Sequence, residues 1–349
     1  MNKIHSGYVY VDVAKLEELL LRKGITKTDF AMRADRRGIS RRTVEAVFNP
    51  AKRNQMSKVI EVLDLLDAPN DFDTYLCDGD PTPGVSIKQW EIDQRVSDWT
   101  VTENGLLYRV YRLRHVHLPS RFGRGKYFDL DDLSDDDQQS VQHYLLRHAE
   151  VCDRLASSPA YPASLQLEHS ADKKYFWVID VWPEGEQLTS RAKQPLDGGA
   201  LARFMLQLLA AIKHAHERGV ILRNLNPNRV YLTEHSLQIT DFELAKLSDG
   251  SPTVTKGESK PCPYVAPEVG GPSIDTTADL YSWAQICLFA ATGTHPAMPG
   301  RADEVSAQVF PATVRKAMQQ CLAIDASDRP QDNQKIMASL KKWSDKVGA

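Results

Sequence analysis

The sequence has few features of secreted or membrane proteins. Its five cysteines are far apart, form no Cys-x-x-Cys pair and are odd in number, which fits neither a disulfide framework nor a zinc site. No apolar run approaches the roughly 18–20 residues that span a bilayer, and the opening stretch "MNKIHSGYVYVDVAK" lacks a signal-peptide core. We therefore expect a cytoplasmic protein with reduced core cysteines and no membrane partner.

A large charge of one sign is also missing. The formal net charge is -3, so the chain is not basic throughout, and any contact with nucleic acid has to come from a local patch. The sequence also has no internal repeat and no low-complexity tract. With 349 residues, of which 42% are hydrophobic, the chain can bury a substantial core and is expected to form two domains.

Turn-forming residues divide the chain between residues 68 and 84, where Pro, Gly, Asp and Asn cluster. The segments before this division have helical periodicity, whereas short strand-like runs and then long amphipathic helices follow it. We predict an all-α domain and an α+β domain of two lobes. The predicted bounds are 1–70 for the first domain, 71–95 for a linker, 96–183 for the small lobe and 184–345 for the large lobe.

Capping residues and apolar spacing predict four helices in the first domain. Each helix starts at an Asp, Thr or Ser whose side chain can accept a hydrogen bond from a free amide of the first turn. These residues are Asp12, Thr26, Ser40 and Ser57. Gly24 is predicted to end the first helix, and Gly38 to form the turn before the third.

The stretch "GISRRTVEAVF" at 38–48 resembles the turn and recognition helix of Cro/repressor-type helix-turn-helix domains, and the resemblance covers about residues 10–68. This family places an inward alanine shortly before the turn glycine. Ala34 keeps that spacing, whereas Ala31 would make the second helix or its turn three residues longer. The resemblance implies DNA binding, and a homodimer that reads two half-sites is plausible.

Positive charge is concentrated in the same domain. Residues 22–58 contain eleven cations and three acids, a local charge of +8 that suits a DNA phosphate backbone. The resemblance implies that the start of the third helix reaches base edges, with Ser40, Arg41, Arg42 and Thr43. The residues expected to meet phosphates are Lys27, Arg36, Arg37 and Arg53. The alternative is a solvated basic face on a domain that docks a protein.

Five stretches of the second domain follow one another at characteristic intervals. They are "LRNLNPNRVYL" at 222–232, "ITDFELAKL" at 239–247, "PYVAPEV" at 263–269, "ADLYSWAQICLFAATGTHP" at 278–296 and "CLAIDASDRP" at 321–330. A set of motifs in the right order is far more specific than any one of them. In the order and spacing of these stretches the chain resembles the eukaryotic-like protein kinases. This family has a small lobe of mixed α and β structure and a helical large lobe.

The resemblance implies that the frame of the large lobe is present. Arg223 matches the arginine of the family's catalytic loop, and Asp279 matches the aspartate that braces this loop. Glu268 and Arg329 match a buried ion pair. The partners of such a pair normally persist together, because removing one leaves an unpaired buried charge at a cost of roughly 3–5 kcal/mol.

The residues that would carry out phosphoryl transfer are mostly replaced. The family's loop, H-R-D-L-K-P-x-N, aligns with residues 222–229. Asn224 stands in place of the aspartate that accepts the substrate's proton, and Asn226 in place of the lysine that neutralises the transferring phosphate. Arg229 replaces the asparagine that holds the second magnesium, and its charge would repel that metal.

The parts that would bind a nucleotide are also incomplete. Asp241 matches the metal-binding aspartate and Glu150 the glutamate of the small-lobe helix, so these two are the candidate cofactor-binding residues. Glu243 replaces a flexible glycine beside Asp241. The stretch at 99–113, which would cover the phosphates, has one glycine, Gly105, where the family has several.

The lysine of the small lobe has no clear counterpart. Its strand is predicted at 125–133, where Asp129 falls near the expected lysine and Lys126 lies three residues away. Glu150 is therefore expected to lack a lysine partner. We also expect the Arg229 guanidinium to pair with the Asp241 carboxylate and to take the place of the metal's charge.

These replacements favour a pseudokinase, a kinase-like domain without phosphotransferase activity. We predict a DNA-binding transcription regulator whose kinase-like domain senses a signal or binds a protein partner, and which needs no cofactor. One alternative is an atypical serine/threonine protein kinase or ATP-binding switch, in which Asp241 holds magnesium with ATP. The other is a protein-interaction scaffold that does not bind DNA.

Overall fold

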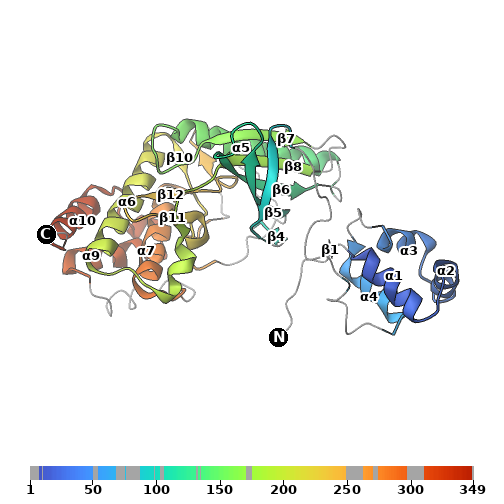
Figure 1. Ribbon diagram of the computed structural model, residues 1–349. Coiled ribbons are helices and arrows are strands. Elements are labelled where there is room, and N and C mark those ends of the chain that lie inside the picture. Colours follow the sequence, from blue (N-terminus) through green and yellow to red (C-terminus); the bar gives the residue numbers. More distant parts are fainter. Residues whose placement is uncertain are drawn as a thin grey trace. The chain divides into compact units, whose positions relative to one another are not determined.

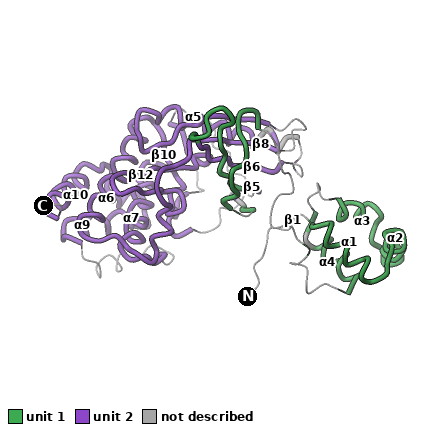
Figure 2. The backbone as a smooth tube through the Cα atoms, viewed as in Figure 1, with its two compact units in different colours: residues 1–101, 109–121 green, residues 102–108, 122–349 purple. Residues whose placement is uncertain are grey.

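The structure is a computed structural model that describes most of the chain. The described residues are 8–9, 11–49, 54–67, 75, 87–97, 99–102, 106–130, 133, 135–169, 175–248, 262–269, 274–296 and 310–347. The chain divides into two compact units, which Figure 2 distinguishes by colour. The first contains residues 1–101 and 109–121, and the second contains residues 102–108 and 122–349.

Residues 8–67 of the first unit form a small domain of four helices and one short sheet (Figure 1). The helices are α1 (Val13–Arg22), α2 (Lys27–Arg36), α3 (Arg41–Val47) and α4 (Met56–Asp64). Strand β1 (Tyr8–Val9) pairs with β2 (Asn54–Gln55) in antiparallel fashion. The domain is therefore not purely helical as predicted. The buried Asn54 side chain donates a hydrogen bond to the Ala46 carbonyl at 3.1 Å, which anchors β2 to the end of α3.

Three of the four predicted helix starts are confirmed by their capping bonds. The side chains of Asp12, Thr26 and Ser40 each accept a hydrogen bond from the amide three residues later, at 3.1–3.2 Å. The prediction for Ser57 was wrong, because α4 begins at Met56, directly after β2, and has no side-chain cap. Local capping signals therefore place helices well where a loop precedes the helix.

Two spacings between the inward alanine and the turn glycine were predicted as alternatives, and the turn between α2 and α3 has the shorter one. Ala34 is fully buried, whereas Ala31 is only half-buried. The Ala34 carbonyl accepts a hydrogen bond from the Ile39 amide at 2.9 Å across Gly38, whose φ of +78° favours glycine. Ala34 is therefore the alanine that packs under the turn.

The first unit also contains strands β3 (Trp90–Arg95), β4 (Thr100–Val101) and most of β5 (Leu107–His115). β3 and β5 are antiparallel, and the Trp90 ring packs edge-on against His115 with centroids 5.1 Å apart. β3 lies within residues 71–95, the segment predicted to be a linker. It was missed because Trp90 and Ile92 are its only apolar residues, which is too few for a clear alternating pattern.

The second unit begins with a sheet-rich part and continues with helices, as predicted. Strands β6 (Phe122–Asp129), β8 (Tyr175–Val181) and β7 (Ser164–His169) are antiparallel in that order. Helix α5 (Asp135–Leu155) contacts β7.

Short elements follow in the described part of this unit. The 3-10 segments are η2 (Leu188–Lys193), η3 (Pro227–Arg229) and η4 (Ala326–Asp328). The short strands that follow are β9 (Glu186–Gln187), β10 (Val220–Ile221), β11 (Val230–Leu232), β12 (Leu237–Ile239) and β13 (Lys246–Leu247).

The helical part is built around two central helices (Figure 1). Its helices are α6 (Gly198–Glu217), α7 (Thr277–Thr292), α9 (Ala312–Cys321) and α10 (Gln334–Val347). α7 is buried along almost its whole length, and its Trp283 indole donates a hydrogen bond to the Met205 carbonyl of α6 at 3.1 Å. This core carries the loops of the candidate site. Among the described residues, no helix is both long and apolar enough to cross a bilayer.

Candidate functional site

Asp241 follows β12 and is almost completely buried. Its carboxylate forms a two-pronged ion pair with Arg124 of β6, whose Nη1 and Nη2 lie 2.8 and 3.0 Å from Oδ1 and Oδ2. Such planar pairs combine charge attraction with fixed geometry, and they are among the stronger hydrogen-bonded contacts in proteins. Arg124 is thus the first partner of the aspartate that the sequence marked as a metal ligand.

Lys126 lies on the same face of β6, because side chains two apart on a strand point the same way. Its ammonium lies 2.8 Å from Oδ1 of Asp241 and 2.5 Å from Oε1 of Glu243. The Tyr108 and Phe128 rings cover it, with centroids 4.6 and 5.4 Å from Nζ. We call Arg124, Lys126, Asp241 and Glu243 the Asp241 cluster.

Both oxygens of the Asp241 carboxylate are engaged in this arrangement. Oδ1 accepts a hydrogen bond from Arg124 and forms an ion pair with the Lys126 ammonium. Oδ2 accepts hydrogen bonds from Arg124 and from the Thr240 hydroxyl at 3.0 Å. Two cations therefore compete with a metal ion for this carboxylate.

Electrostatics keeps the cluster charged although it is buried. Burial alone would raise the pKa of Asp241, but Arg124, Lys126 and then Arg229 hold that pKa well below its usual range. Burial likewise opposes ionisation of Glu243, and Lys126 lowers the pKa of this glutamate. The two carboxylates in turn raise the pKa of Lys126 against the effect of its own burial. The cluster is thus a network of ionised groups.

The Arg229 side chain contacts the main chain of Asp241. Its Nη1 donates a hydrogen bond to the Asp241 carbonyl at 2.6 Å. We expected Arg229 to pair with the Asp241 carboxylate; the two-pronged pair with this carboxylate is made by Arg124. The prediction missed this because Arg124 is 117 positions away from Asp241 in the sequence.

The structure does not bring Glu150 to this cluster. The Glu150 side chain is 46% exposed and accepts a hydrogen bond from Arg154 one helical turn later, at 2.8 Å. His148 is the α5 residue that contacts the Asp241 segment. Its Nδ1 lies 3.1 Å from the Phe242 amide, and its ring stacks on the Phe242 ring with centroids 5.6 Å apart. The strand predicted at 125–133 overlaps β6 only over residues 125–129, because β6 begins at Phe122 and ends at Asp129. Lys126 rather than Asp129 pairs with the carboxylates of the cluster.

The asparagines of the 222–229 loop are held by the fold and carry no charge. The Asn226 side chain accepts a hydrogen bond from the Asn228 amide at 3.0 Å and so starts η3. Asn224 is 5% exposed, and neither polar atom of its side chain has a hydrogen-bond partner among the described residues. Neither amide can act as the proton acceptor that a carboxylate provides.

The backbone of this loop is braced by Asp279, which is completely buried in α7. Its carboxylate accepts hydrogen bonds from the Leu222 and Arg223 amides at 2.8 and 2.7 Å, and from the His216 ring at 2.8 Å. Arg223 has a φ of +63°, a left-handed conformation that is uncommon for a residue with a side chain. Asp279 therefore holds the loop in a strained shape.

A second ion pair ties the end of the 263–269 segment to the region before α10. The two terminal guanidinium nitrogens of Arg329, Nη1 and Nη2, donate hydrogen bonds to the Glu268 carboxylate at 2.6 and 2.9 Å. Arg329 also donates to the carbonyls of Ala323 and Ile324, each at 2.9 Å. The frame residues Asp279, Glu268 and Arg329 therefore make extensive contacts.

The basic residues of α2 and α3 that were expected to contact DNA lie on the surface of the helical domain. Arg36, Arg37, Arg41 and Arg42 are exposed, and Thr43 is half-buried. Arg41 pairs with Glu45 at 2.9 Å, and Lys27 pairs with Glu17. The Ser40 and Thr43 hydroxyls lie 2.9 Å apart at the start of α3. Arg53 and Gly105, which the sequence also singled out, lie outside the described residues.

Comparison with known proteins identifies the family. The protein kinase domain family matches residues 142–345, more than half of the chain, and the chain belongs to this family. The solved kinase domain of Mycobacterium tuberculosis PknI has the same fold, with a TM-score of 0.55, 19% identity, and coverage of 75% of this chain and 98% of that one.

Two curated relatives are both named serine/threonine-protein kinases. PknK of Mycobacterium tuberculosis is 27% identical over 216 residues, which cover 56% of this chain and 19% of PknK. Pkn1 of Myxococcus xanthus is 28% identical over 184 residues, which cover 47% of this chain and 26% of Pkn1. The present chain thus matches only about a fifth to a quarter of the length of these relatives.

Proposed function

We propose that this chain is a regulatory protein whose kinase domain is a pseudokinase that senses a signal or binds a protein partner. The observation that supports the proposal is the set of contacts made by the Asp241 carboxylate. Its carboxylate, which would hold magnesium in an active kinase, accepts hydrogen bonds from Arg124 and Thr240 and forms an ion pair with Lys126. In this proposal the internal cations take the place of the metal, and the domain needs neither ATP nor magnesium for its role.

The loop at 222–229 supports the same proposal through different physical effects. Asn224 removes the proton acceptor, and general-base assistance contributes on the order of 10²- to 10⁴-fold to a rate. Asn226 removes a positive charge from the transferring phosphate, and Arg229 puts a cation where a second magnesium ligand would be. These losses act on separate parts of one reaction, so one compensating residue cannot offset them all.

We expect ATP with magnesium to leave the thermal unfolding temperature of the full chain unchanged. The reason is that binding stabilises a fold only when the ligand binds the native state, and here two internal cations, Arg124 and Lys126, already pair with the Asp241 carboxylate. The measurement is a thermal-shift titration, with phosphate transfer to the chain itself followed by radiolabel. Asp241→Asn serves as the site variant and Asp275→Asn, an exposed carboxylate, as its control. A magnesium-dependent shift that Asp241→Asn abolishes would contradict the proposal.

A second candidate is an atypical serine/threonine protein kinase. The printed names of PknK and Pkn1 favour it, because both relatives are called serine/threonine-protein kinases. In this candidate Arg124 and Lys126 release Asp241 when the metal and the nucleotide bind. Transfer of phosphate to serine or threonine of a protein substrate, lost in Asp241→Asn, would establish it.

For the first unit we propose DNA binding, which makes the chain a cytoplasmic transcription regulator. The support is the short spacing from Ala34 to Gly38, the exposed arginines at the start of α3 and the local charge of +8 over residues 22–58. A homodimer that reads two half-sites belongs to the same proposal. A protein-docking role for this basic surface is the alternative.

We expect the full chain to bind random-sequence duplex DNA with an affinity that falls steeply as salt rises. Each phosphate that a cation neutralises contributes about -0.9 to the slope of log K against log salt. The double substitution Arg36→Ala with Arg37→Ala should therefore flatten the slope by about 2. Lys341→Ala, an exposed cation of α10, is the matched control. Affinity that does not depend on salt would indicate the protein-docking alternative.

A further inference from the structure

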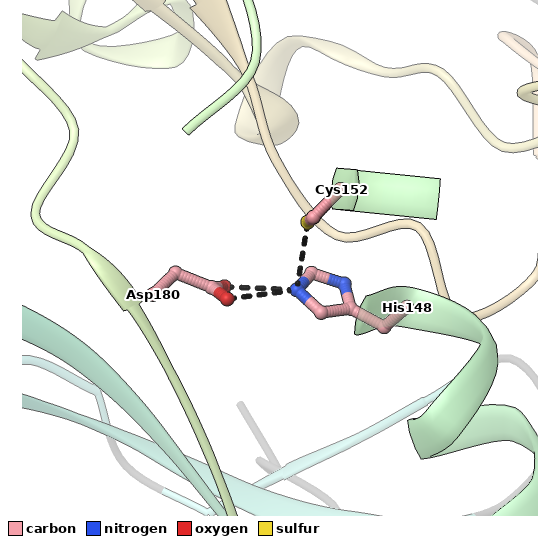
Figure 3. A group of neighbouring side chains, drawn as sticks. All are labelled: His148, Cys152 and Asp180. Atoms are coloured by element: carbon pink, nitrogen blue, oxygen red, sulfur yellow. Dashed lines mark hydrogen bonds and ion pairs between the residues drawn. The ribbon is translucent and has the colours of Figure 1, made fainter. Parts of the chain in front are cut away.

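A second cluster of chemically active side chains lies beside the Asp241 segment. His148 and Cys152 are one helical turn apart on the same face of α5, and Asp180 lies on β8 (Figure 3). The His148 Nε2 atom lies 2.9 and 3.0 Å from the two oxygens of Asp180 and 3.5 Å from the Cys152 sulfur. All three side chains are buried. We call them the His148 cluster.

The geometry does not suit a nucleophilic cysteine. In a Cys-His-Asp arrangement the imidazole contacts the nucleophile through one nitrogen and the carboxylate through the other. Here the sulfur and the carboxylate both face Nε2, as Figure 3 shows, while Nδ1 meets the Phe242 amide. The imidazole therefore cannot pass a proton from the thiol to the carboxylate.

The close approach of the Cys152 sulfur, the His148 Nε2 atom and the Asp180 carboxylate suits a metal ion. One sulfur, one imidazole nitrogen and one carboxylate oxygen are all zinc ligands, and their ligand atoms lie within 4.8 Å of one another. A tetrahedral site with bonds of about 2.0–2.3 Å has edges of about 3.3–3.8 Å. The contacts of Nε2 with the Asp180 oxygens need to open slightly, the contact of Nε2 with the sulfur already has a suitable length, and the sulfur and the carboxylate lie within 4.8 Å of each other. From this geometry we propose that the His148 cluster binds one Zn²⁺ ion.

Charge balance favours this ion at a buried position. A thiolate and a carboxylate together carry two negative charges, which Zn²⁺ neutralises, and a neutral assembly avoids most of the cost of burying charge. Arg124 lies directly across from Asp180 in the β6–β8 pairing, but its guanidinium is engaged with Asp241. The zinc site is thus independent of the Asp241 cluster in its ligands.

One of the three ligands borders a groove. The groove has a volume of about 320 Å³ and lies between α5 and β7, and Cys152 is among its lining residues, whereas His148 and Asp180 are not. An entry path is one of the requirements for a real metal site, so the ion would reach Cys152 first. The three side chains fill three positions of a tetrahedral site, and a water molecule would complete it.

Zinc binding has a defined consequence for the neighbouring segment. Cys152 releases its thiol proton to solvent, and Nε2 must present its lone pair to the metal, so the proton of the neutral ring resides on Nδ1. A protonated Nδ1 cannot accept the hydrogen bond that the Phe242 amide now directs at it. Zinc binding therefore moves the backbone at Phe242, next to Asp241, and links metal availability to the candidate site.

The test measures zinc bound by the full chain. After loading with zinc and dialysis, elemental analysis is expected to find one zinc per chain in the wild type and in Cys262→Ser, a half-buried cysteine that is not among these ligands. Cys152→Ser and the nearly isosteric Asp180→Asn should weaken zinc binding by more than about 100-fold, because even the loss of an outer-shell partner costs about 10- to 100-fold.

A second measurement keeps the test decisive if a variant fails to fold. Cobalt added to the wild-type chain is expected to give the charge-transfer absorption of a thiolate ligand, and zinc should displace it. Absence of that absorption from the folded wild type would overturn the proposal, and so would zinc retained at full stoichiometry by folded Cys152→Ser. Neither result bears on nucleotide binding at Asp241.

Discussion

Replacing Arg124 with methionine is expected to lower the free energy of unfolding of the kinase domain by about 3–5 kcal/mol. The substitution keeps most of the side-chain volume but removes the two-pronged partner of a buried carboxylate. For a domain of this size the loss corresponds to a fall of at least about 6 °C in unfolding temperature. Calorimetry of the full chain can measure it. Arg203→Met on the exposed side of α6 is the matched control and should stay within about 0.5 kcal/mol of wild type.

The same variant has a pH signature that a loss of packing would not produce. The pKa of Asp241 is held well below its unfolded-state value of about 4, so the unfolded chain binds more protons in the range between the two. The stability that this ion pair contributes is therefore present above about pH 4 and is lost as the pH falls through the folded pKa. Arg124→Met should reduce this acid sensitivity.

A double substitution tests whether the two residues act as a pair. Arg124→Met leaves the Asp241 charge with Lys126 as its remaining ion-pair partner, and Asp241→Asn removes that charge, so the combined variant should be more stable than the sum of the single losses predicts. If the losses simply add, Arg124 and Asp241 are not coupled and the assignment of Arg124 as the internal replacement for a metal ion is wrong.

Removing the Asp279 side chain as Asp279→Ala is expected to cost about 2–6 kcal/mol. The estimate follows from the two buried amides, of Leu222 and Arg223, that would each lose their acceptor at about 1–3 kcal/mol. The His216 ring loses a partner as well. Hydrogen exchange of the Leu222 and Arg223 amides should accelerate with the loss of these bonds, which can be followed by mass spectrometry.

Asp275→Ala provides the control for this experiment. Asp275 is exposed and its carboxylate accepts a hydrogen bond from the Thr277 amide at the start of α7, at 2.8 Å. Its loss is expected to cost about 1 kcal/mol, the usual net contribution of one hydrogen bond. Should Asp279→Ala behave like Asp275→Ala, with unchanged exchange at Leu222 and Arg223, the bracing role of Asp279 would be disproved.

Features that depend on neighbouring residues could be predicted from the sequence. The caps at Asp12, Thr26 and Ser40 each act over three positions, so their signal lies within one short stretch. The kinase motifs are also contiguous strings, and the family match at 142–345 confirms the kinase-like fold that they indicated. The strand β3 was not predicted, because its mostly polar residues give little alternation of apolar and polar positions.

Contacts between distant strands could not be predicted in the same way. Arg124 and Lys126 are each 117 positions from their carboxylate partners, and no local pattern pairs them. Their spacing of two places both cations on one face of β6, but the strand was predicted to begin at residue 125 and so left Arg124 out. The spacing of four between His148 and Cys152 was a similar signal on a helix, and it was missed because the cysteines were judged only against each other.

The backbone beside the site carries conformational energy. Arg223 and Asp241 both have positive φ, at +63° and +70°, although each bears a side chain. Such conformations cost of the order of 1–3 kcal/mol each and persist only where surrounding contacts hold them. The contacts are those of Asp279 on one residue and of Arg124 and Lys126 on the other. A partner that draws Arg124 away from Asp241 would therefore be assisted by the relaxation of this backbone, so a modest binding event could rearrange the whole segment.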